Sequence, residues 1–145
     1  MSYSNDMYGQ IIIDHVENPR NKNKNHQGYG EYTLKNPSCG DMVTVYVKIN
    51  KDIIEDITYA VEGCSVCSAS TSIMSSLLIG KSLEEAKKII SNFNDMVIGN
   101  NYDEDILGEA ISLKGVATIP SRIKCATLAY KAFALAANIG GDKDE

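Results

Sequence analysis

The sequence contains no apolar run that approaches the roughly 20 residues needed to span a bilayer. Residues 1–6 contain neither the basic nor the apolar region of a secretory signal. Basic residues are too few for a nucleic-acid surface, because 14 Lys and Arg stand against 19 Asp and Glu, for a formal net charge of -5. We therefore expect a cytoplasmic protein that binds neither membranes nor nucleic acid.

The composition that remains is typical of a globular protein. Hydrophobic residues make up 43% of the chain and charged residues 23%. At 145 residues, with no internal repeat or low-complexity segment, the chain is expected to form one domain, residues 1–145, with a core that needs no disulfide support. The four cysteines of a cytosolic chain stay reduced, so they favour metal binding or catalysis over disulfides.

Alternating apolar and polar residues predict a small β-sheet. Residues 42–49 and 53–61 both alternate, and the turn at residues 50–52 joins them into a hairpin. Residues 31–35 form a shorter candidate for an edge strand. The sequence thus predicts an α+β fold, in which an antiparallel sheet of about three strands packs against a set of helices.

Helical spacing of apolar residues predicts the helices. Residues 6–18 form a first helix that ends before Pro19, and a second begins after Cys64. Residues 82–92 carry a capping box, Ser82 with Glu85, and residues 120–138 begin with Pro120 at a first-turn position. Residues 103–113 are expected to form one more helix.

Three cysteines stand where a loop or a helix begins. Cys39 precedes the first hairpin strand and Cys64 follows the second, so antiparallel pairing places both at the same end of the sheet. Cys64 and Cys125 lie near helix N-termini, where free N–H groups and the helix dipole favour a thiolate. With Asp41 nearby, such a site suits tetrahedral zinc or an iron–sulfur cluster. The alternative is a set of scattered, buried structural cysteines.

Cys67 leaves a further choice open. The spacing Cys64-x-x-Cys67 is compatible with a closed four-cysteine zinc site or a redox pair. Because Cys67 falls one turn inside the expected helix, we favour a packing role for it. By the same reasoning His15 is expected to be a packed histidine rather than a ligand, and His26 to be exposed.

Several motifs, in order along nearly the whole chain, resemble the family of iron–sulfur cluster assembly proteins that includes IscU and the N-terminal domain of NifU. They are Tyr8 with His15, Asn18-Pro19-Arg20-Asn21, Asn36-Pro37-x-Cys39-Gly40-Asp41, Gly63-Cys64 with Ala69-Ser70, Gly80-Lys81-Ser82, and Arg122-Ile123-Lys124-Cys125-Ala126. The chain is most similar to the SufU branch of the family. It has Lys124 where the scaffold branch has a histidine, an additional segment at residues 102–115, and a different sequence in place of the chaperone-recognition motif, at residues 119–123.

The resemblance implies a zinc-dependent sulfurtransferase that accepts persulfide sulfur from a pyridoxal-phosphate (PLP) cysteine desulfurase of the SufS type. It implies that Cys39, Asp41, Cys64 and Cys125 bind one zinc ion, and it makes other Suf assembly proteins candidate downstream partners. Cys39 is our first choice as sulfur acceptor, since its loop is bounded by Pro37 and Gly40, and Cys125 is the second. Arg122 is a candidate partner for Asp41 when that carboxylate leaves the metal, or else a solvated residue.

Two other functions compete with the sulfurtransferase. One is a scaffold on which a transient [2Fe–2S] cluster forms on the same ligands, and Lys124 speaks against it. The other is a non-catalytic structural zinc domain held by all four cysteines.

Overall fold

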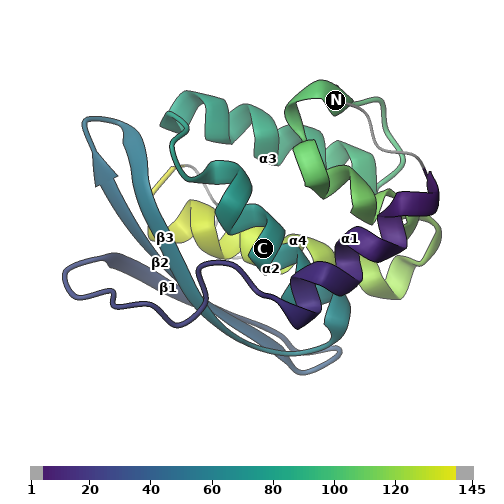
Figure 1. The fold of residues 1–145 in the computed structure, drawn as a ribbon, viewed down its shortest axis with the longest axis horizontal. Coiled ribbons are helices and arrows are strands. Elements are labelled where there is room, and N and C mark those ends of the chain that lie inside the picture. Colours follow the sequence, from purple (N-terminus) through teal and green to yellow (C-terminus); the bar gives the residue numbers. More distant parts are fainter. Residues whose placement is uncertain (1–4, 140–145) are drawn as a thin grey trace.

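The computed structural model describes residues 5–139 and has the expected α+β architecture. The elements in chain order are α1 (Asn5–Glu17), β1 (Gly30–Asn36), β2 (Asp41–Asn50), β3 (Ile53–Glu62), α2 (Ser65–Leu78), α3 (Leu83–Val97), the 3-10 helices η1 (Glu104–Ile106) and η2 (Gly108–Thr118), and α4 (Pro120–Ala136). The sheet forms one layer and the helices gather on one of its faces (Figure 1). Within residues 5–139, no helix is both long and apolar enough to cross a membrane.

The sheet is antiparallel, with the strand order β1-β2-β3, and the expected hairpin is its second half. Lys51 and Asp52 form the tight turn with φ values of 52° and 65°, the left-handed geometry that a two-residue hairpin needs. Asn36 pairs with Asp41 and Met42 pairs with Glu62. This register brings the β1–β2 connection and the end of β3 to the same end of the sheet.

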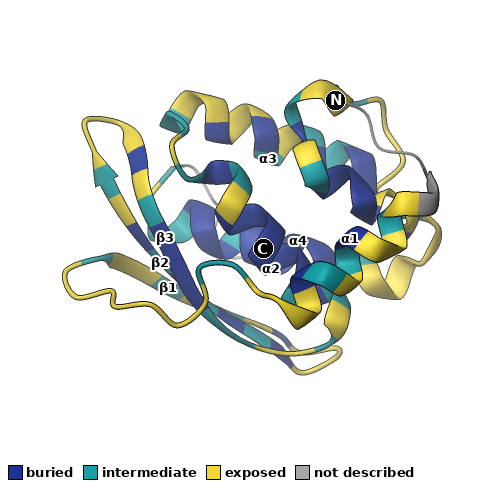
Figure 2. Cartoon of the chain, viewed as in Figure 1, coloured by how far each residue is buried: buried dark blue, intermediate teal, exposed yellow. Residues whose placement is uncertain are grey.

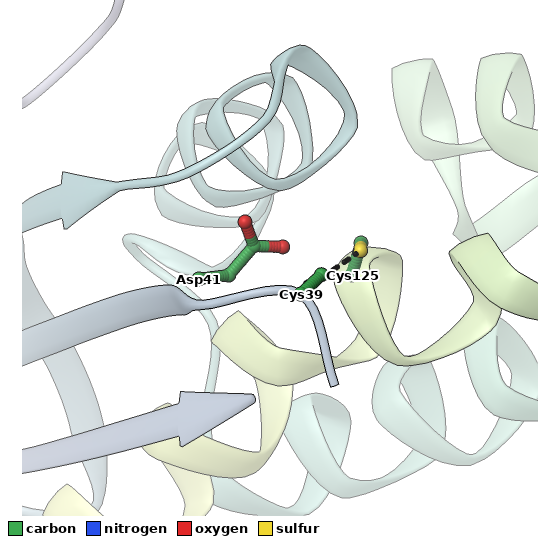
Figure 3. A group of neighbouring side chains, drawn as sticks. All are labelled: Cys39, Asp41 and Cys125. Atoms are coloured by element: carbon green, nitrogen blue, oxygen red, sulfur yellow. Dashed lines mark hydrogen bonds between the residues drawn. The ribbon is translucent and has the colours of Figure 1, made fainter. Parts of the chain in front are cut away.

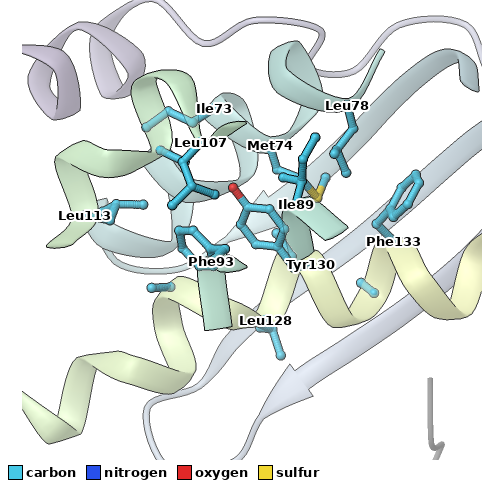
Figure 4. Close-up of a cluster of buried hydrophobic side chains, with 14 of the residues drawn as sticks. Ile73, Met74, Leu78, Ile89, Phe93, Leu107, Leu113, Leu128, Tyr130 and Phe133 are labelled. Atoms are coloured by element: carbon cyan, nitrogen blue, oxygen red, sulfur yellow. The ribbon is translucent and has the colours of Figure 1, made fainter. Parts of the chain in front are cut away.

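One face of the sheet supplies the core. Val43, Val45 and Val47 are buried on that face, where α2 and α4 pack against the strands. Dark blue runs along most of α2 and α4, whereas α3 shows its exposed residues on one side (Figure 2). Further out, the aromatic rings of Phe93 and Tyr130 stack with centroids 4.1 Å apart (Figure 4). Burial of the apolar Phe93 side chain contributes about 1.5–3 kcal/mol.

A segment that we call the strap, residues 20–28, lies against the outer edge of β3. The Asn23 N–H donates to the Tyr59 carbonyl at 2.9 Å, and the Lys24 N–H donates to Thr58 Oγ1 at 2.8 Å. The Lys24 ammonium then forms an ion pair with Asp56 at 2.7 Å. The strap thus occupies hydrogen-bonding groups that an edge strand otherwise leaves free.

The helices after α2 differ in part from the sequence prediction. The capping box at Ser82 and Glu85 is confirmed, and α3 continues to Val97. Residues 103–113, expected as an ordinary helix, instead contribute to η1 and η2. Buried residues recur there at every third position, at Leu107, Ala110, Leu113 and Val116, which matches the three residues per turn of a 3-10 helix. Helix α4 ends at Ala136, two residues earlier than expected.

Candidate metal centre

Side chains from three separate elements meet at the end of the sheet where β1 turns into β2. Cys39 lies on the connecting loop, Asp41 opens β2, and Cys125 projects from α4 (Figure 3). The two sulfur atoms are 3.4 Å apart, and one ligand atom from each of the three residues lies within 4.8 Å of the others. Cys39 is exposed, while Asp41 and Cys125 are buried.

Cys64 contacts this group at Asp41. It is the N-cap residue of α2, and its backbone N–H donates to Asp41 Oδ1 at 3.0 Å. Its sulfur lies 3.7 Å from Asp41 Oδ2. The structure therefore places all four predicted ligands at one end of the sheet, with Cys39, Asp41 and Cys125 forming the tighter group.

Two separations between these side chains match those between the ligands of a tetrahedral zinc ion. Zinc bonds of about 2.3 Å to sulfur and about 2.1 Å to oxygen place two sulfur ligands about 3.8 Å apart, and a sulfur and an oxygen about 3.6 Å apart. The observed separations are 3.4 Å between Cys39 and Cys125 and 3.7 Å between Cys64 and Asp41. Three thiols and one carboxyl group also match the donors that zinc prefers.

Gly63 and Asn36 border the predicted ligands, although the sequence alone assigned neither of them a role at the site. A Cβ atom at Gly63 would lie 2.5 Å from Asp41 Oδ1, so the carboxylate occupies the space of a missing side chain. Asn36 is only 3% exposed and directs its amide toward Cys125 and the Cys39 loop. The sequence signals were there, in the Asn-Pro pair before Cys39 and the glycine before Cys64, but both patterns are also typical of ordinary turns.

The surroundings of the site favour the ionised form of the Asp41 carboxyl group and the protonated form of the buried Cys125 thiol. Burial raises the pKa of Asp41, but hydrogen bonds from the thiols of Cys125 and Cys39 and from the Cys64 backbone outweigh it, so the net shift is downward. Burial, together with contacts to Asp41 and Cys39, raises the pKa of Cys125. Cys125 lies in the second turn of α4, so the thiolate expected from a helix N-terminus is opposed by burial. A bound divalent cation is what removes such a proton near neutral pH.

Arg122 is exposed and lies on the Cys125 side of the site. A hydrogen bond to the Cys125 sulfur and the nearby charge of Cys64 raise the pKa of its guanidinium. Among residues 5–139, no ion pair joins it to Asp41.

The group of Cys39, Asp41 and Cys125 does not include Cys67, His15 or His26. Cys67 is fully buried, and burial, followed by the charges of Asp41 and Cys64, raises its pKa to about 12. His15 is buried, with its Nδ1 atom 2.7 Å from Ser72 Oγ and its Nε2 atom 3.0 Å from Glu109 Oε1. His26 is exposed and stacks on the Tyr46 ring with the centroids 3.6 Å apart.

Comparison with known proteins agrees with this geometry. The sequence pattern of the NifU-like N terminal domain matches residues 7–132. The zinc-dependent sulfurtransferase SufU of Bacillus subtilis is 42% identical over 127 residues, covering 87% of this chain and 86% of the relative. The iron–sulfur cluster assembly scaffold protein IscU of Streptococcus pyogenes is also 42% identical, over 133 residues, covering 91% and 83%. A crystal structure of a hypothetical protein superposes with a TM-score of 0.86 at 40% identity, covering 93% of this chain and 99% of that one.

The matched region includes every residue of the candidate metal centre, from Asn36 to Cys125. The chain therefore belongs to the NifU-like N-terminal domain family, together with these SufU and IscU relatives.

Proposed function

We propose that this protein is a zinc-dependent sulfurtransferase that accepts persulfide sulfur from a PLP-dependent cysteine desulfurase of the SufS type, for use in iron–sulfur cluster assembly. The observation that carries the proposal is the group of Cys39, Asp41 and Cys125, with one exposed thiol beside a buried one. The similarity to a relative named as a zinc-dependent sulfurtransferase supports it.

The zinc ion would be held by Cys39, Asp41, Cys64 and Cys125. When bound, it would keep the three sulfurs deprotonated near neutral pH without any redox chemistry that consumes a persulfide. Asp41 is the hardest donor of the four, so it is the ligand that a partner side chain would displace most readily. Arg122, which is exposed on the Cys125 side, is the candidate to pair with the released carboxylate.

Cys39 is the sulfur acceptor in this proposal, because it is the exposed member of the group and lies on a loop. Its thiolate attacks the terminal sulfur of the partner's persulfide, so a bond forms between Cys39 Sγ and that sulfur. The sulfur–sulfur bond of the partner breaks, and the partner's cysteine leaves as a thiolate. No net oxidation occurs. Cys125, buried against Asp41, is the second candidate.

The scaffold function remains the second candidate, because the IscU relative is as similar as the SufU relative. Lys124, which precedes Cys125, favours the sulfurtransferase. Metal analysis separates the two functions when the protein is purified without added iron. The sulfurtransferase predicts a colourless protein with a single zinc ion per chain, whereas a brown protein with visible absorbance supports the scaffold.

The activity test measures sulfide and alanine release by a SufS-type desulfurase in the presence of this chain. Cys39→Ser and Asp41→Ala should each abolish stimulation, whereas Cys67→Ser should retain both zinc and stimulation because Cys67 is packed in the core. Full stimulation by Cys39→Ser would exclude Cys39 as the acceptor. Loss of zinc in Cys67→Ser would instead support the four-cysteine structural domain.

A further inference from the structure

Asn36 contacts each residue of the group of Cys39, Asp41 and Cys125, either through its backbone or through its side chain. It is the last residue of β1, and it pairs with Asp41 across the sheet. Its backbone carbonyl accepts hydrogen bonds from the N–H groups of Cys39 at 3.3 Å and Gly40 at 2.8 Å. The Cys39 loop is thus anchored on this one residue.

The side chain of Asn36 has its orientation fixed by the same loop. Its Oδ1 atom accepts the Ser38 N–H at 3.1 Å, so the oxygen end of the amide faces the loop. The Nδ2 end therefore faces the other way, and the contact that it makes is with Cys125 Sγ at 4.0 Å. Because the side chain is only 3% exposed, water does not compete freely for these N–H groups.

An N–H donor at this position has a specific use once a metal is bound. Three thiolates and one carboxylate carry four negative charges against the two positive charges of zinc, and N–H groups directed at the ligands offset part of that excess. Asp41 receives such a bond from the Cys64 backbone. Asn36 faces the sulfur of Cys125 in the same way.

We propose that Asn36 is a positioning residue of the metal centre, which donates a hydrogen bond to the metal-bound Cys125 thiolate while it anchors the Cys39 loop. This inference rests on the proposed zinc site. It assigns metal affinity, and the environment of one sulfur, to a residue that is not itself a ligand.

The test variant is Asn36→Ser, because a serine hydroxyl can still accept the Ser38 N–H but is too short to reach Cys125. The matched control is Asn92→Ser. The side chain of Asn92 also accepts a backbone N–H, that of Asp103, at 2.8 Å, and it donates to the Lys88 carbonyl at 2.8 Å. Asn92 lies on α3, outside the metal centre. Both variants lose an amide donor, and only one loses it at the metal centre.

Zinc affinity is measured by competition with a chromophoric chelator, and the sulfur environment by the charge-transfer absorption of the cobalt-loaded chain. Asn36→Ser should bind zinc at least about tenfold more weakly than the wild type and shift the sulfur-to-cobalt band. Asn92→Ser should change neither. Equal affinity and an unshifted band in Asn36→Ser would overturn the proposal for Asn36 while leaving the zinc site intact. A wild-type chain that binds no zinc would overturn the site and this inference together.

Should Asn36→Ser fail to fold, the wild-type chain provides a second measurement. The side-chain amide protons of Asn36 should shift downfield in the NMR spectrum when cadmium is added as a zinc substitute, since the donor then faces a thiolate. Unchanged Asn36 amide signals in a cadmium-loaded chain would overturn the proposal.

Discussion

Residue 63 lies so close to Asp41 that a side chain there meets the carboxylate directly. The distances from a Cβ atom would be 2.5 Å to Oδ1, 2.9 Å to Cγ and 3.1 Å to Cβ of Asp41. Asp41 is itself confined, because it accepts the Cys64 N–H and is buried. Any side chain at position 63 therefore displaces a predicted ligand.

Gly63→Ala should accordingly weaken zinc binding by at least about tenfold, in line with changes to residues that orient ligands. Chelator competition measures the effect. The control is Gly9→Ala on α1, where a Cβ atom would meet nothing within 4 Å and the substitution should stabilise the helix slightly. Unchanged affinity in Gly63→Ala would show that Asp41 is free to move or is not a ligand.

The sequence indicates which residue types can form the site, and the structure adds how they are held. The convergence of Cys39 and Cys64 follows from antiparallel pairing alone. The burial of Cys125 does not, because how deeply a helix residue lies depends on how that helix packs on the sheet. The contacts of Asn36 depend on its burial for the same reason.

At the scale of elements, a buried histidine ties α1 to two other helices. His15 on α1 contacts Ser72 on α2 and Glu109 on η2, and the Arg20 N–H also donates to Ser72 Oγ at 2.9 Å. The sequence predicts a packed histidine here, and it is one. Its partners could not be predicted, because they lie 57 and 94 residues away.

His15→Ala should lower the free energy of unfolding by about 2–4 kcal/mol, because it leaves a cavity and removes one hydrogen-bond partner each from Ser72 and Glu109. Glu109→Gln keeps an acceptor oxygen and should cost only about 0.5–1.5 kcal/mol. Denaturant titration of both variants measures the difference. If His15→Ala loses no more stability than Glu109→Gln, His15 is not the residue that links α1 to α2 and η2.

The ion pair between Lys24 of the strap and Asp56 of β3 makes the stability of the fold depend on pH. Burial raises the pKa of Asp56, but hydrogen bonds from Lys24 and Tyr29 outweigh it and place the pKa below its usual value of 3.8. The folded chain thus binds this proton more weakly than the unfolded chain does. The resulting stability is fully present above the unfolded pKa and is lost as the pH falls through the folded pKa.

Asp56→Asn should therefore cost about 0.5–1 kcal/mol at pH 7, and the difference from the wild type should narrow below about pH 4. Denaturant titrations at a series of pH values measure it. Glu55→Gln serves as the control on the same strand, since its partner Lys48 is an exposed surface residue 3.4 Å away. If the stability difference between Asp56→Asn and the wild type widens toward acid pH, the pKa of Asp56 is not lowered in the folded chain.

The helix type of residues 104–118 also belongs to this scale. Apolar residues at three- and four-residue spacings fit an ordinary helix and a 3-10 helix nearly equally well in a short segment. Leu107 separates η1 from η2, and Gly108, with a φ of 50°, begins η2. Packing against α1 and α3 then selects the three-residue repeat. Contacts with other elements thus determine the helix type, which the local spacing of apolar residues does not.

At the scale of the whole molecule, the candidate metal centre draws its residues from four separate parts of the fold. The predicted ligands come from the β1–β2 loop, from β2, from the N-cap position of α2 and from α4. Alternating strands and capped helices could be predicted from local patterns, but not how α4 packs across the sheet. A bound metal should hold that arrangement against unfolding.

Removal of zinc by a chelator should therefore lower the melting temperature of the wild-type chain. A free zinc concentration a thousand times the Kd stabilises the folded chain by about 4 kcal/mol, which corresponds to roughly 8–16 °C for a chain of this size. Scanning calorimetry with and without zinc measures the shift, and Cys64→Ser should reduce it. Equal melting temperatures with and without zinc would contradict a metal that bridges these elements.

The separation of the two closest thiols along the chain also has a consequence for biosynthesis. Cys39 and Cys125 are 86 residues apart, so a ribosome that adds about 5–20 residues per second needs roughly 4–17 s to travel from one codon to the other. During that interval Cys39 has already been made while its buried companion does not yet exist. The candidate site is therefore incomplete until the last helix is translated, and any ion that all four residues hold is captured after that point.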